Sequence, residues 1–372
     1  MKRYLVIIAA VIAIYCPLMS QTVSKTGTTA AQFLKIGIGA RALGMGGAFS
    51  AVSNDATALY WNPAGVSLNK KNKIILDHQD WILDVDLDFI GGSFKTPFGT
   101  VGAAISAMHM GEMEVTTTRD PEGTGEKFSA GSIMGQLTFS RTLTDRFSFG
   151  ISAKIIRESI YNSKANGFAL DLGTLYDTQI PGLTMGMSIS NYGTKMQMEG
   201  RDMLLQTEVD PSLESDPINI NANFATDSYE LPLIFRFGLA YKRDLPNKLS
   251  ILVAADALHP NDNTESINLG SELSFKDFLF LRSGIASLYQ RDSVAGLSFG
   301  CGIKLKIVNS YYYIDYTFVD MGPLGDPKSK EYKAMERIKN KAEKMAKKNR
   351  LKAKNESIGM NFIRKHYQKN DE

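Results

Sequence analysis

The sequence predicts an all-β protein: a transmembrane antiparallel β-barrel of about 14 strands, with a short helical N-terminal hatch in the lumen. Two observations predict this fold. From about Lys73 onward, apolar residues alternate with small, polar or charged ones, and this is the period of a strand with two unlike faces. The alternating segments are about ten residues long, which is the length of tilted strands that cross a bilayer. The connections between them are alternately short and long, as in outer-membrane barrels.

Residues 1–20 have the pattern of a cleaved secretory signal peptide. Lys2 and Arg3 precede an apolar run from Leu5 to Ile14, and the small Ser20 follows. The run is shorter than the roughly 20 apolar residues of a spanning helix, so a membrane anchor is the weaker interpretation. Cys16 allows lipid attachment, but the residue before it is bulky. We expect cleavage near Ser20 and export.

Residues 21–68 form the expected hatch. Glycines cluster between Gly37 and Gly47 without alternation. Asn54 is predicted to cap a short helix that runs to Trp61, because its side chain can accept a hydrogen bond from the first turn. Pro63 ends this helix, since the residue before a proline avoids helical geometry. The sequence leaves two placements open: packing inside the lumen, or an arm on the periplasmic side below the barrel.

The barrel is expected over residues 69–363. Long connections are external and short turns periplasmic in outer-membrane barrels, and an even strand count then puts both chain ends on the periplasmic side. A soluble β-sandwich also alternates, but the strand length and the asymmetry of the connections favour a barrel. The predicted strands lie near 73–80, 86–94, 100–110, 130–141, 146–157, 166–177, 183–191, 230–242, 248–257, 265–275, 278–287, 293–306, 310–319 and 356–363.

The alternation also predicts which side chains face the lumen. A Lys or Arg on the lipid side costs about 2–4 kcal/mol near the midplane, so charged residues of the strands are expected inside. They can bind a polar headgroup or, as we favour, pair with one another. The faces of Leu279–Ile285 cannot be assigned. The candidate lumen-facing polar residues are Lys154, Asp171, Arg236, Glu272 and Lys304. The tyrosines expected in an interfacial girdle are Tyr241, Tyr311, Tyr312 and Tyr313.

A basic segment at 326–354 precedes the last predicted strand. It has ten lysines and two arginines against four acidic residues, a net charge of +8. Apolar residues at spacings of three and four indicate a weakly amphipathic helix in an external loop. This helix can contact anionic lipopolysaccharide or an acidic partner, but a solvated charged loop is the favoured interpretation. A polar tail, 364–372, ends the chain.

Two runs, Gly39–Phe49 and Asn54–Gly65, resemble the PorV/PorQ family of outer-membrane proteins. That family is similar to the FadL long-chain fatty-acid transporters, which have an Asn-Pro-Ala motif in a hatch inside a fourteen-strand barrel. Met321–Gly325 also resembles the family, whereas the basic insert departs from it. The resemblance implies an outer-membrane location and, for PorV itself, a role in type IX secretion. The hatch-motif residues are Arg41, Asn54, Asp55, Asn62, Pro63, Ala64 and Gly65.

No enzyme chemistry is predicted. Gly296–Gly300 matches the pattern around a nucleophilic serine, but Ser298 lies inside a predicted strand rather than at the strand-to-helix turn that this motif needs. The four histidines have no metal-like spacing and Cys301 is isolated. Calcium at Asp84, Asp86 and Asp88 is a weak alternative. We expect no catalytic residue, no cofactor and no metal.

Two functions stay open at this point. One is a PorV/PorQ-type role in protein export or surface attachment, with secretion-system proteins or exported cargo as partners. The other is FadL-like passive transport, with a hydrophobic small molecule in the lumen. Both place the protein in contact with outer-membrane lipid, and neither involves nucleic acid. Fold does not decide between them.

Overall fold

A computed structural model describes residues 25–69, 71–82, 85–121, 123–208, 219–290, 296–322 and 333. The predicted signal peptide, all but one residue of the basic segment, the strand expected near 356–363 and the polar tail lie outside the described residues. Within these ranges, no helix is both long enough and apolar enough to cross a membrane.

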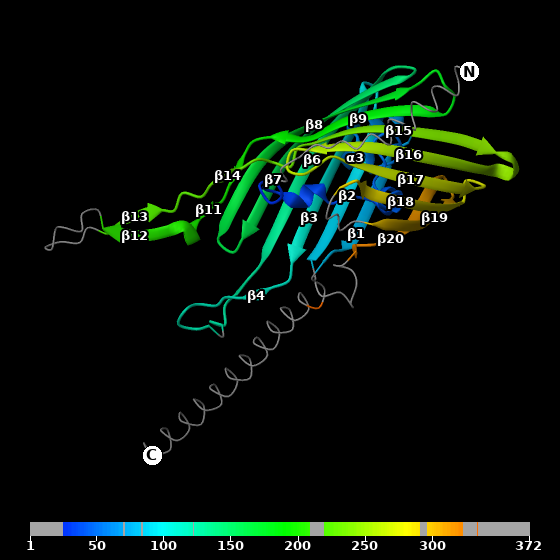
Figure 1. The fold of residues 1–372 in the computed structure, drawn as a ribbon. Helices are drawn as coiled ribbons and strands as arrows, with labels where there is room; N and C mark the ends of the chain where they lie inside the picture. Colours follow the sequence, from blue (N-terminus) through cyan, green and yellow to red (C-terminus); the bar gives the residue numbers. More distant parts are fainter. Residues whose placement is uncertain are drawn as a thin grey trace.

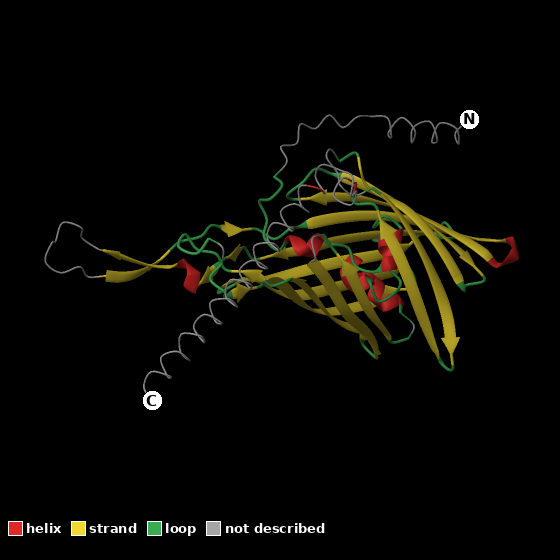
Figure 2. Cartoon of the chain, turned by 90° about the horizontal axis from the view of Figure 1, so that it is seen from below, coloured by secondary structure: helices red, strands yellow, loops and turns green. Residues whose placement is uncertain are grey.

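The architecture is an antiparallel sheet of fourteen strands curved into a barrel wall around the N-terminal segment (Figures 1 and 2). Thirteen strands follow one another in the sheet, and short β11 (Glu199–Gly200) pairs with β8. The predicted fold class is confirmed, as are the first thirteen predicted strands. In sheet order they are β1 (Lys73–Asp80), β2 (Val85–Thr96), β3 (Gly99–Met110), β6 (Ala130–Thr144), β7 (Phe147–Ile160), β8 (Ser163–Asp177), β9 (Leu183–Gly193), β15 (Ile234–Leu245), β16 (Leu249–Pro260), β17 (Ser266–Phe275), β18 (Leu279–Leu288), β19 (Leu297–Ile307) and β20 (Ser310–Val319).

The two ends of the wall differ. At one, the short-turn end, tight connections join the strands, as at Gly182, whose φ of +85° suits glycine. At the other, the long-loop end, extended connections project beyond the sheet (Figure 1). These loops contain the strand pairs β4 (Met113–Glu114) with β5 (Lys127–Phe128), β10 (Met196–Gln197) with β14 (Ser228–Tyr229), and β12 (Leu204–Glu208) with β13 (Asn219–Asn223).

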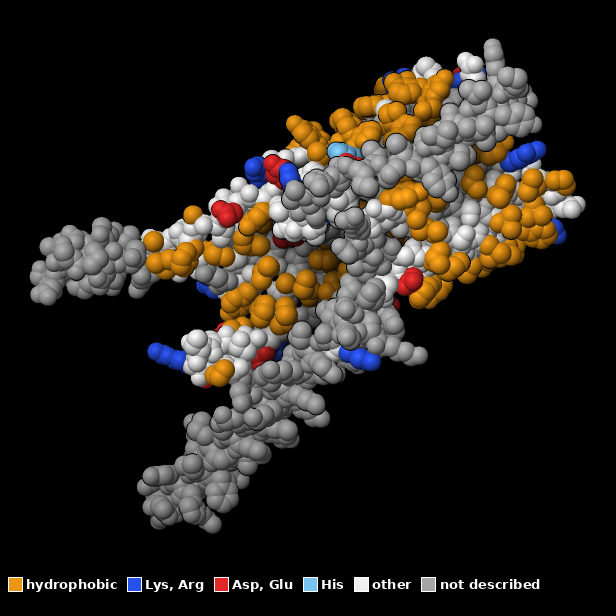
Figure 3. All heavy atoms as spheres, in the orientation of Figure 1, with side chains coloured by type: hydrophobic (Ala, Val, Ile, Leu, Met, Phe, Trp, Pro, Cys, Tyr) orange, Lys and Arg blue, Asp and Glu red, His pale blue; other side chains and the backbone are white. Residues whose placement is uncertain are grey.

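The wall has an apolar outer face and a mostly small or polar inner face. On β7, Ile151 and Ile155 are exposed on the outside, whereas Ser152 and Lys154 are buried on the inside. Figure 3 shows hydrophobic side chains spread over the outer surface. The strand whose faces could not be assigned from sequence, β18, points Arg282 inward, and its burial alternates along most of its length.

Half of the predicted tyrosine girdle is wrong. Tyr313 is the register partner of Lys304, and the Lys304 ammonium lies 5.6 Å from its ring centroid and 5.0 Å from that of Tyr311. Both rings therefore lie on the inward side of β20. Tyr241 and Tyr312 are exposed on the outer side. The reason is the strand period: consecutive residues of one strand cannot share a face.

The hatch lies inside the curved sheet rather than below it (Figure 2). It contains η1 (Gln32–Lys35), α2 (Ala40–Gly44), α3 (Ala58–Trp61) and η2 (Pro63–Leu68). The expected cap is wrong, because α3 begins after Thr57 and no side chain caps it. Asn62 is extended, as the proline after it requires.

The hatch crosses the lumen from one end to the other. Its first described residues lie at the long-loop end, where the Ala30 amide donates to the Glu230 carbonyl (2.9 Å) and Lys35 pairs with Asp262 (3.0 Å). Its last turn lies at the short-turn end, where the Ser67 amide donates to Ser140 Oγ (3.2 Å). The first described residues therefore lie at the opposite end from the one that the strand count predicts for the N-terminus. The hatch thus crosses the lumen once, and the strand count that was used to place the termini does not include this crossing.

Candidate functional site

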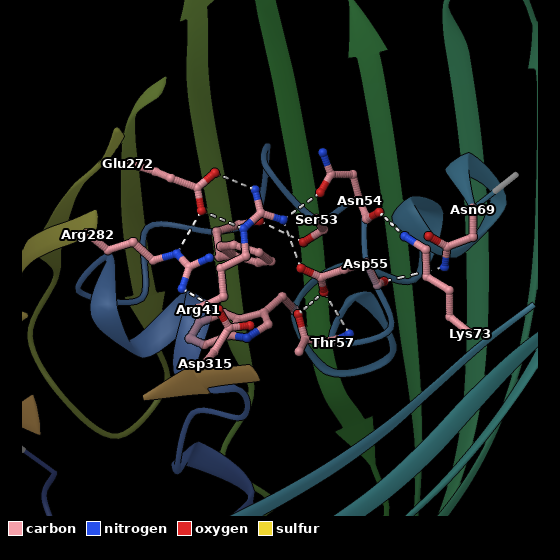
Figure 4. A network of polar contacts seen from close by, with 12 residues as sticks. Arg41, Ser53, Asn54, Asp55, Thr57, Asn69, Lys73, Glu272, Arg282 and Asp315 are labelled. Atoms are coloured by element: carbon pink, nitrogen blue, oxygen red, sulfur yellow. Dashed lines mark hydrogen bonds and ion pairs between the residues drawn. The ribbon is translucent and has the colours of Figure 1, made fainter. Parts of the chain in front are cut away.

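The candidate site is the interface between the hatch and the inner wall. Its centre is Arg41 on α2 (Figure 4). The guanidinium donates two hydrogen bonds to the Glu272 carboxylate of β17, Nε to Oε2 at 2.8 Å and Nη2 to Oε1 at 2.9 Å. Its Nη1 donates to Asn54 Oδ1 (2.7 Å) and Asp55 Oδ2 (2.9 Å). A forked cation thus joins the wall to two parts of the hatch.

The network continues through the wall. Arg282 of β18 donates from Nε to Glu272 Oε2 (2.7 Å) and from Nη1 to Asp315 Oδ1 of β20 (2.6 Å). The Arg282 side chain is 1% exposed. Each arginine of this network contacts two carboxylates, so every charge in it has an opposite partner.

Two more predicted residues form a separate buried pair in the wall. Lys154 Nζ lies 2.6 Å from Asp171 Oδ2 and donates to Asn191 Oδ1 (2.9 Å). The Asn191 amide in turn donates to Asp171 Oδ1 (2.8 Å). These contacts join β7, β8 and β9, so this pair fixes the wall and does not itself bind the hatch.

Arg236 and Lys304, the remaining predicted residues, are not brought together with the others. The buried Arg236 guanidinium donates to Ser190 Oγ (3.0 Å) and lies 5.8 Å and 5.6 Å from the ring centroids of Tyr60 and Trp61 in the hatch. This is cation–π geometry. Lys304 lies at the short-turn end and pairs with Asp277.

The Asn62-Pro63-Ala64-Gly65 run shapes a tight turn against the wall. Asn62 Nδ2 donates to the Ser50 carbonyl (2.8 Å) and the Thr174 carbonyl (3.1 Å), and its Oδ1 accepts from the Ala64 amide (3.1 Å). A Cβ at Gly65 would lie 2.0 Å from the Ser53 carbonyl oxygen. Only glycine fits this approach of two hatch segments.

Glycines on the inner wall let the hatch come close. A Cβ on Gly150 would lie 2.3 Å from the Pro63 carbonyl carbon, and one on Gly284 would lie 2.2 Å from the Gly46 nitrogen. Such distances exclude any side chain, so the wall is shaped to the hatch backbone. The wall glycines with hatch atoms this near are Gly102, Gly150, Gly173, Gly186, Gly270 and Gly284.

On the side of β6 to β8, the hydrogen bonds with α3 and η2 are neutral. Ser140 Oγ donates to the Ala64 carbonyl (3.0 Å). Gln136 Nε2 donates to the Leu59 carbonyl (2.6 Å) and to Ser152 Oγ (3.0 Å). Helix η2 packs against β6, β7 and β8, whereas α2 packs against β18, β19 and β20.

An apolar cluster fills the lumen toward the long-loop end. Hatch, wall and loop all contribute to it, and Tyr60 joins it with its hydroxyl donating to the Leu34 carbonyl (3.1 Å). Nearer the short-turn end, the same wall strands carry small or polar inward residues. The apolar core runs along the hatch as far as Val66, and its members toward the long-loop end include Phe33 and Leu34 from the hatch, Leu87, Phe89, Met134 and Ile156 from the wall, and Met196 and Leu231 from the loop.

Among the charged residues that sequence reasoning missed, Asp256 and Asp262 bind the hatch directly, whereas Arg282 and Asp315 extend the Arg41 network through the wall. Asp256 Oδ2 accepts from the amides of Phe49 (3.0 Å) and Ser50 (2.8 Å). The inward position of Arg282 could have been predicted from the sequence, because it lies two residues before Gly284 and therefore on the same face of the strand. Ser298 lies within β19 and faces the hatch, where its Oγ accepts from the Gly46 amide (3.1 Å) and donates to the Gly44 carbonyl (3.3 Å). The turn that a nucleophilic serine needs is not found there.

The sequence profile of an uncharacterised protein family, UPF0164, matches residues 7–156. No match was found among curated proteins. Among solved structures, a Pseudomonas aeruginosa FadL homologue is 13% identical, with 76% of this chain and 90% of that chain covered and a TM-score of 0.44. The Pseudomonas putida toluene transporter TodX is 12% identical (76% and 91% covered, TM-score 0.48). The Ralstonia pickettii toluene transporter TbuX is 12% identical (76% and 97% covered, TM-score 0.46).

Proposed function

We propose that this protein is an outer-membrane barrel that carries hydrophobic small molecules, with the hatch as its gate. The apolar cluster inside the lumen is the observation that carries the proposal. An inner wall that only enclosed water would not need Phe89, Met134 and Ile156 gathered on its inward face. Sites for small apolar ligands are lined by such side chains, with a few polar groups for orientation. Methionine adapts its shape to different ligands.

The hatch gives this site a means of control. Hatch residues Phe33 and Leu34 complete the cluster, and the same chain continues into α2 and the Arg41 network. A ligand that enters from the long-loop end meets the hatch before it reaches the short-turn end. Passage therefore requires the hatch to shift, and the buried ion pairs oppose that shift.

We infer an outer-membrane location from the apolar outer face of the wall. Exposed apolar residues cover the wall strands, and hydrocarbon accepts such a surface while water does not. Hydrocarbon offers no hydrogen-bond partner to a free strand edge, so a membrane-embedded sheet must close. In the described part of the chain, β1 and β20 are the two edges of the wall, and no pairing joins them.

We propose that residues 356–363, which lie outside the described residues, supply the closing strand. Both β1 and β20 run from the short-turn end to the long-loop end, so an antiparallel closure needs one strand of opposite direction between them. The chain leaves β20 at the long-loop end, where such a strand would start. Ile358, Met360 and Phe362 alternate with Ser357, Gly359 and Asn361, as apolar outer residues alternate with small inner ones elsewhere.

The free edges allow a direct test of this closure. Tyr316 lies on β20, which has no neighbour on one side, whereas Leu239 lies on β15 between β9 and β16. With Cys301 replaced by serine, cysteines at Tyr316 and Met360 should form a disulfide in outer membranes, whereas a cysteine pair at Leu239 and Met360 should not. Equal cross-linking of both pairs would contradict the closure.

Native mass spectrometry of the full-length protein purified from outer membranes tests the transport function. We expect a bound hydrophobic small molecule in the wild type. Its occupancy should fall in the double variant Met196→Ala/Leu231→Ala and stay unchanged in Met113→Ala, which alters an exposed loop residue. A protein partner in constant ratio, with no bound small molecule, would overturn the proposal and favour the export role, which stays a prediction.

A further inference from the structure

Two histidines and three aspartates gather on the outer face of the wall at the long-loop end. His78 and Asp80 lie on β1, Asp86 and Asp88 on β2, and His109 on β3. The register places His78 opposite Asp88, Asp80 opposite Asp86, and Asp86 opposite His109. We call these five residues the outer His/Asp cluster. The hatch network and the lumen do not include it.

The distances within the cluster suit one small cation. His78 Nε2 lies 3.4 Å from Asp80 Oδ1, and His109 Nε2 lies 3.5 Å from Asp86 Oδ2. Ligand atoms of His78, Asp80 and Asp86 all lie within 4.8 Å of one another. Around tetrahedral zinc, bonds of about 2.0–2.2 Å put ligand atoms about 3.3–3.6 Å apart. The side chains thus need only small rotations to share an ion.

One histidine ring of the cluster is oriented by a carboxylate behind it. His78 Nδ1 lies 2.8 Å from Asp88 Oδ1. A carboxylate at this nitrogen favours the proton on Nδ1, so Nε2, which faces Asp80 Oδ1 at 3.4 Å, is the nitrogen available to a cation. Metal-binding histidines are held in this way by a carboxylate behind the ring. Asp88 is therefore a positioning residue rather than a ligand.

The negative charges of the outer His/Asp cluster also favour the binding of a cation. With neutral histidines the cluster carries three negative charges on neighbouring strands, and like charges opposite one another destabilise a sheet. Directly beside it lies an outer-face hollow of about 290 Å³, which has apolar side chains from Leu76, Ile90 and Ile105 as well as His78 and Asp88 in its lining. The Asp80 side chain is 93% exposed and that of Asp88 is 51% exposed, so an ion can reach both from solvent.

We propose that the outer His/Asp cluster binds one divalent transition-metal ion of the zinc type, with His78, Asp80 and Asp86 as ligands and His109 as the fourth. Two imidazoles favour this class of metal over magnesium or calcium, which prefer all-oxygen sites. The bound ion joins three strands at the border of the apolar outer face. This proposal does not depend on what the lumen carries.

Isothermal titration of Zn²⁺ into the untagged, chelator-treated full-length protein in detergent tests the site. We expect one saturable zinc per chain and no comparable binding of Mg²⁺. His78→Ala should abolish saturable binding. Asp88→Asn should weaken it about 10- to 100-fold, as loss of a partner behind a metal-bound histidine does. The matched control is His259→Ala, because His259 is also exposed and also has a carboxylate 3.1 Å from Nδ1 (Glu265) but belongs to no such cluster.

Three results would overturn the proposal: no saturable zinc binding by the wild type, equal binding by His78→Ala, or an equal loss in His259→Ala. Heat-modifiable migration on gels, compared across all variants, shows whether each barrel has folded. Asp80→Asn is a second ligand variant that keeps the side-chain shape, and it should weaken binding as well. Unchanged affinity in Asp80→Asn together with His109→Ala would also contradict the site.

Discussion

The two sides of the barrel wall hold the hatch in different ways. On the charged side, β17, β18 and β20 bind α2 through Arg41, Glu272 and Arg282. On the neutral side, β6, β7 and β8 hold η2 through Ser140 and glycines that fit its backbone, without an ion pair among the described contacts. Glycines fit the hatch backbone on both sides, as Gly270 and Gly284 do on the charged side, but on that side the hatch also depends on ion pairs.

This difference has consequences for movement of the hatch. A neutral hydrogen bond contributes about 0.5–1.5 kcal/mol, and several small losses there add up gradually. Removal of one partner from a buried ion pair costs about 3–5 kcal/mol, because the other charge is left unpaired. We therefore expect single substitutions to free α2 more readily than η2.

The largest effect is expected from Glu272→Ala. It leaves Arg41 and Arg282 without the carboxylate that they share, so hatch attachment should weaken by about 3–5 kcal/mol. Hydrogen exchange of the amides in α2, measured by mass spectrometry, should accelerate strongly, while exchange in η2 changes little. Glu272→Gln, which keeps the size of the side chain, separates loss of charge from loss of packing. Equal acceleration of hydrogen exchange in α2 and η2 would contradict the inference that the two sides of the wall hold the hatch independently.

A steric change should disturb the neutral side next. Gly150→Ala places a Cβ 2.3 Å from the Pro63 carbonyl carbon, and overpacking of this kind costs about 1–3 kcal/mol. Exchange should then accelerate in η2 and not in α2. Gly135→Ala is the matched control, because a Cβ there meets only the outer Ile155 side chain at 3.4 Å. Similar exchange in both variants would show that close fit does not hold η2.

A smaller effect is expected from Ser140→Ala. The variant removes the hydroxyl that donates to the Ala64 carbonyl and accepts from the Ser67 amide. Because both bonds are neutral and the one from Ser67 is only partly buried, the loss should be about 1 kcal/mol. Thermal unfolding with circular dichroism should show a lower midpoint than the wild type. An effect larger than that of Glu272→Ala would reverse the proposed ranking of the two sides.

The smallest effect concerns pH at the long-loop end. Burial opposes ionisation of Asp262, but hydrogen bonds from Gln32, Lys35 and Thr29 prevail and lower its pKa. The stabilisation is therefore present above the unfolded pKa of about 3.9 and is lost as pH falls through the lower folded value. Protection of residues 29–35 from hydrogen exchange should fall only in that acid range. In Asp262→Asn it should be low at neutral pH as well, and full protection there would contradict this assignment.

Much of the wall was predictable, because the alternation of residues within each strand shows which side chains face the lumen and which face outward. The inward position of Lys154 follows from Ser152 and Ile155 beside it, without knowledge of any other strand. The structure of the hatch was harder to predict from the sequence. Asn54 is a good helix cap by composition, but a guanidinium from α2 competes for its side-chain oxygen, and that contact is not visible in the local sequence.

Local sequence patterns were enough to predict the strands, their faces, the alternation of short turns and long loops, and the presence of a segment that does not alternate. These are local properties, set by the geometry of one strand or one turn. Only the tertiary structure decided that the hatch starts at the long-loop end, that Arg282 meets Glu272 and Asp315, and that His78 lies near His109. Such contacts depend on the register between strands distant in the chain, which no local pattern contains.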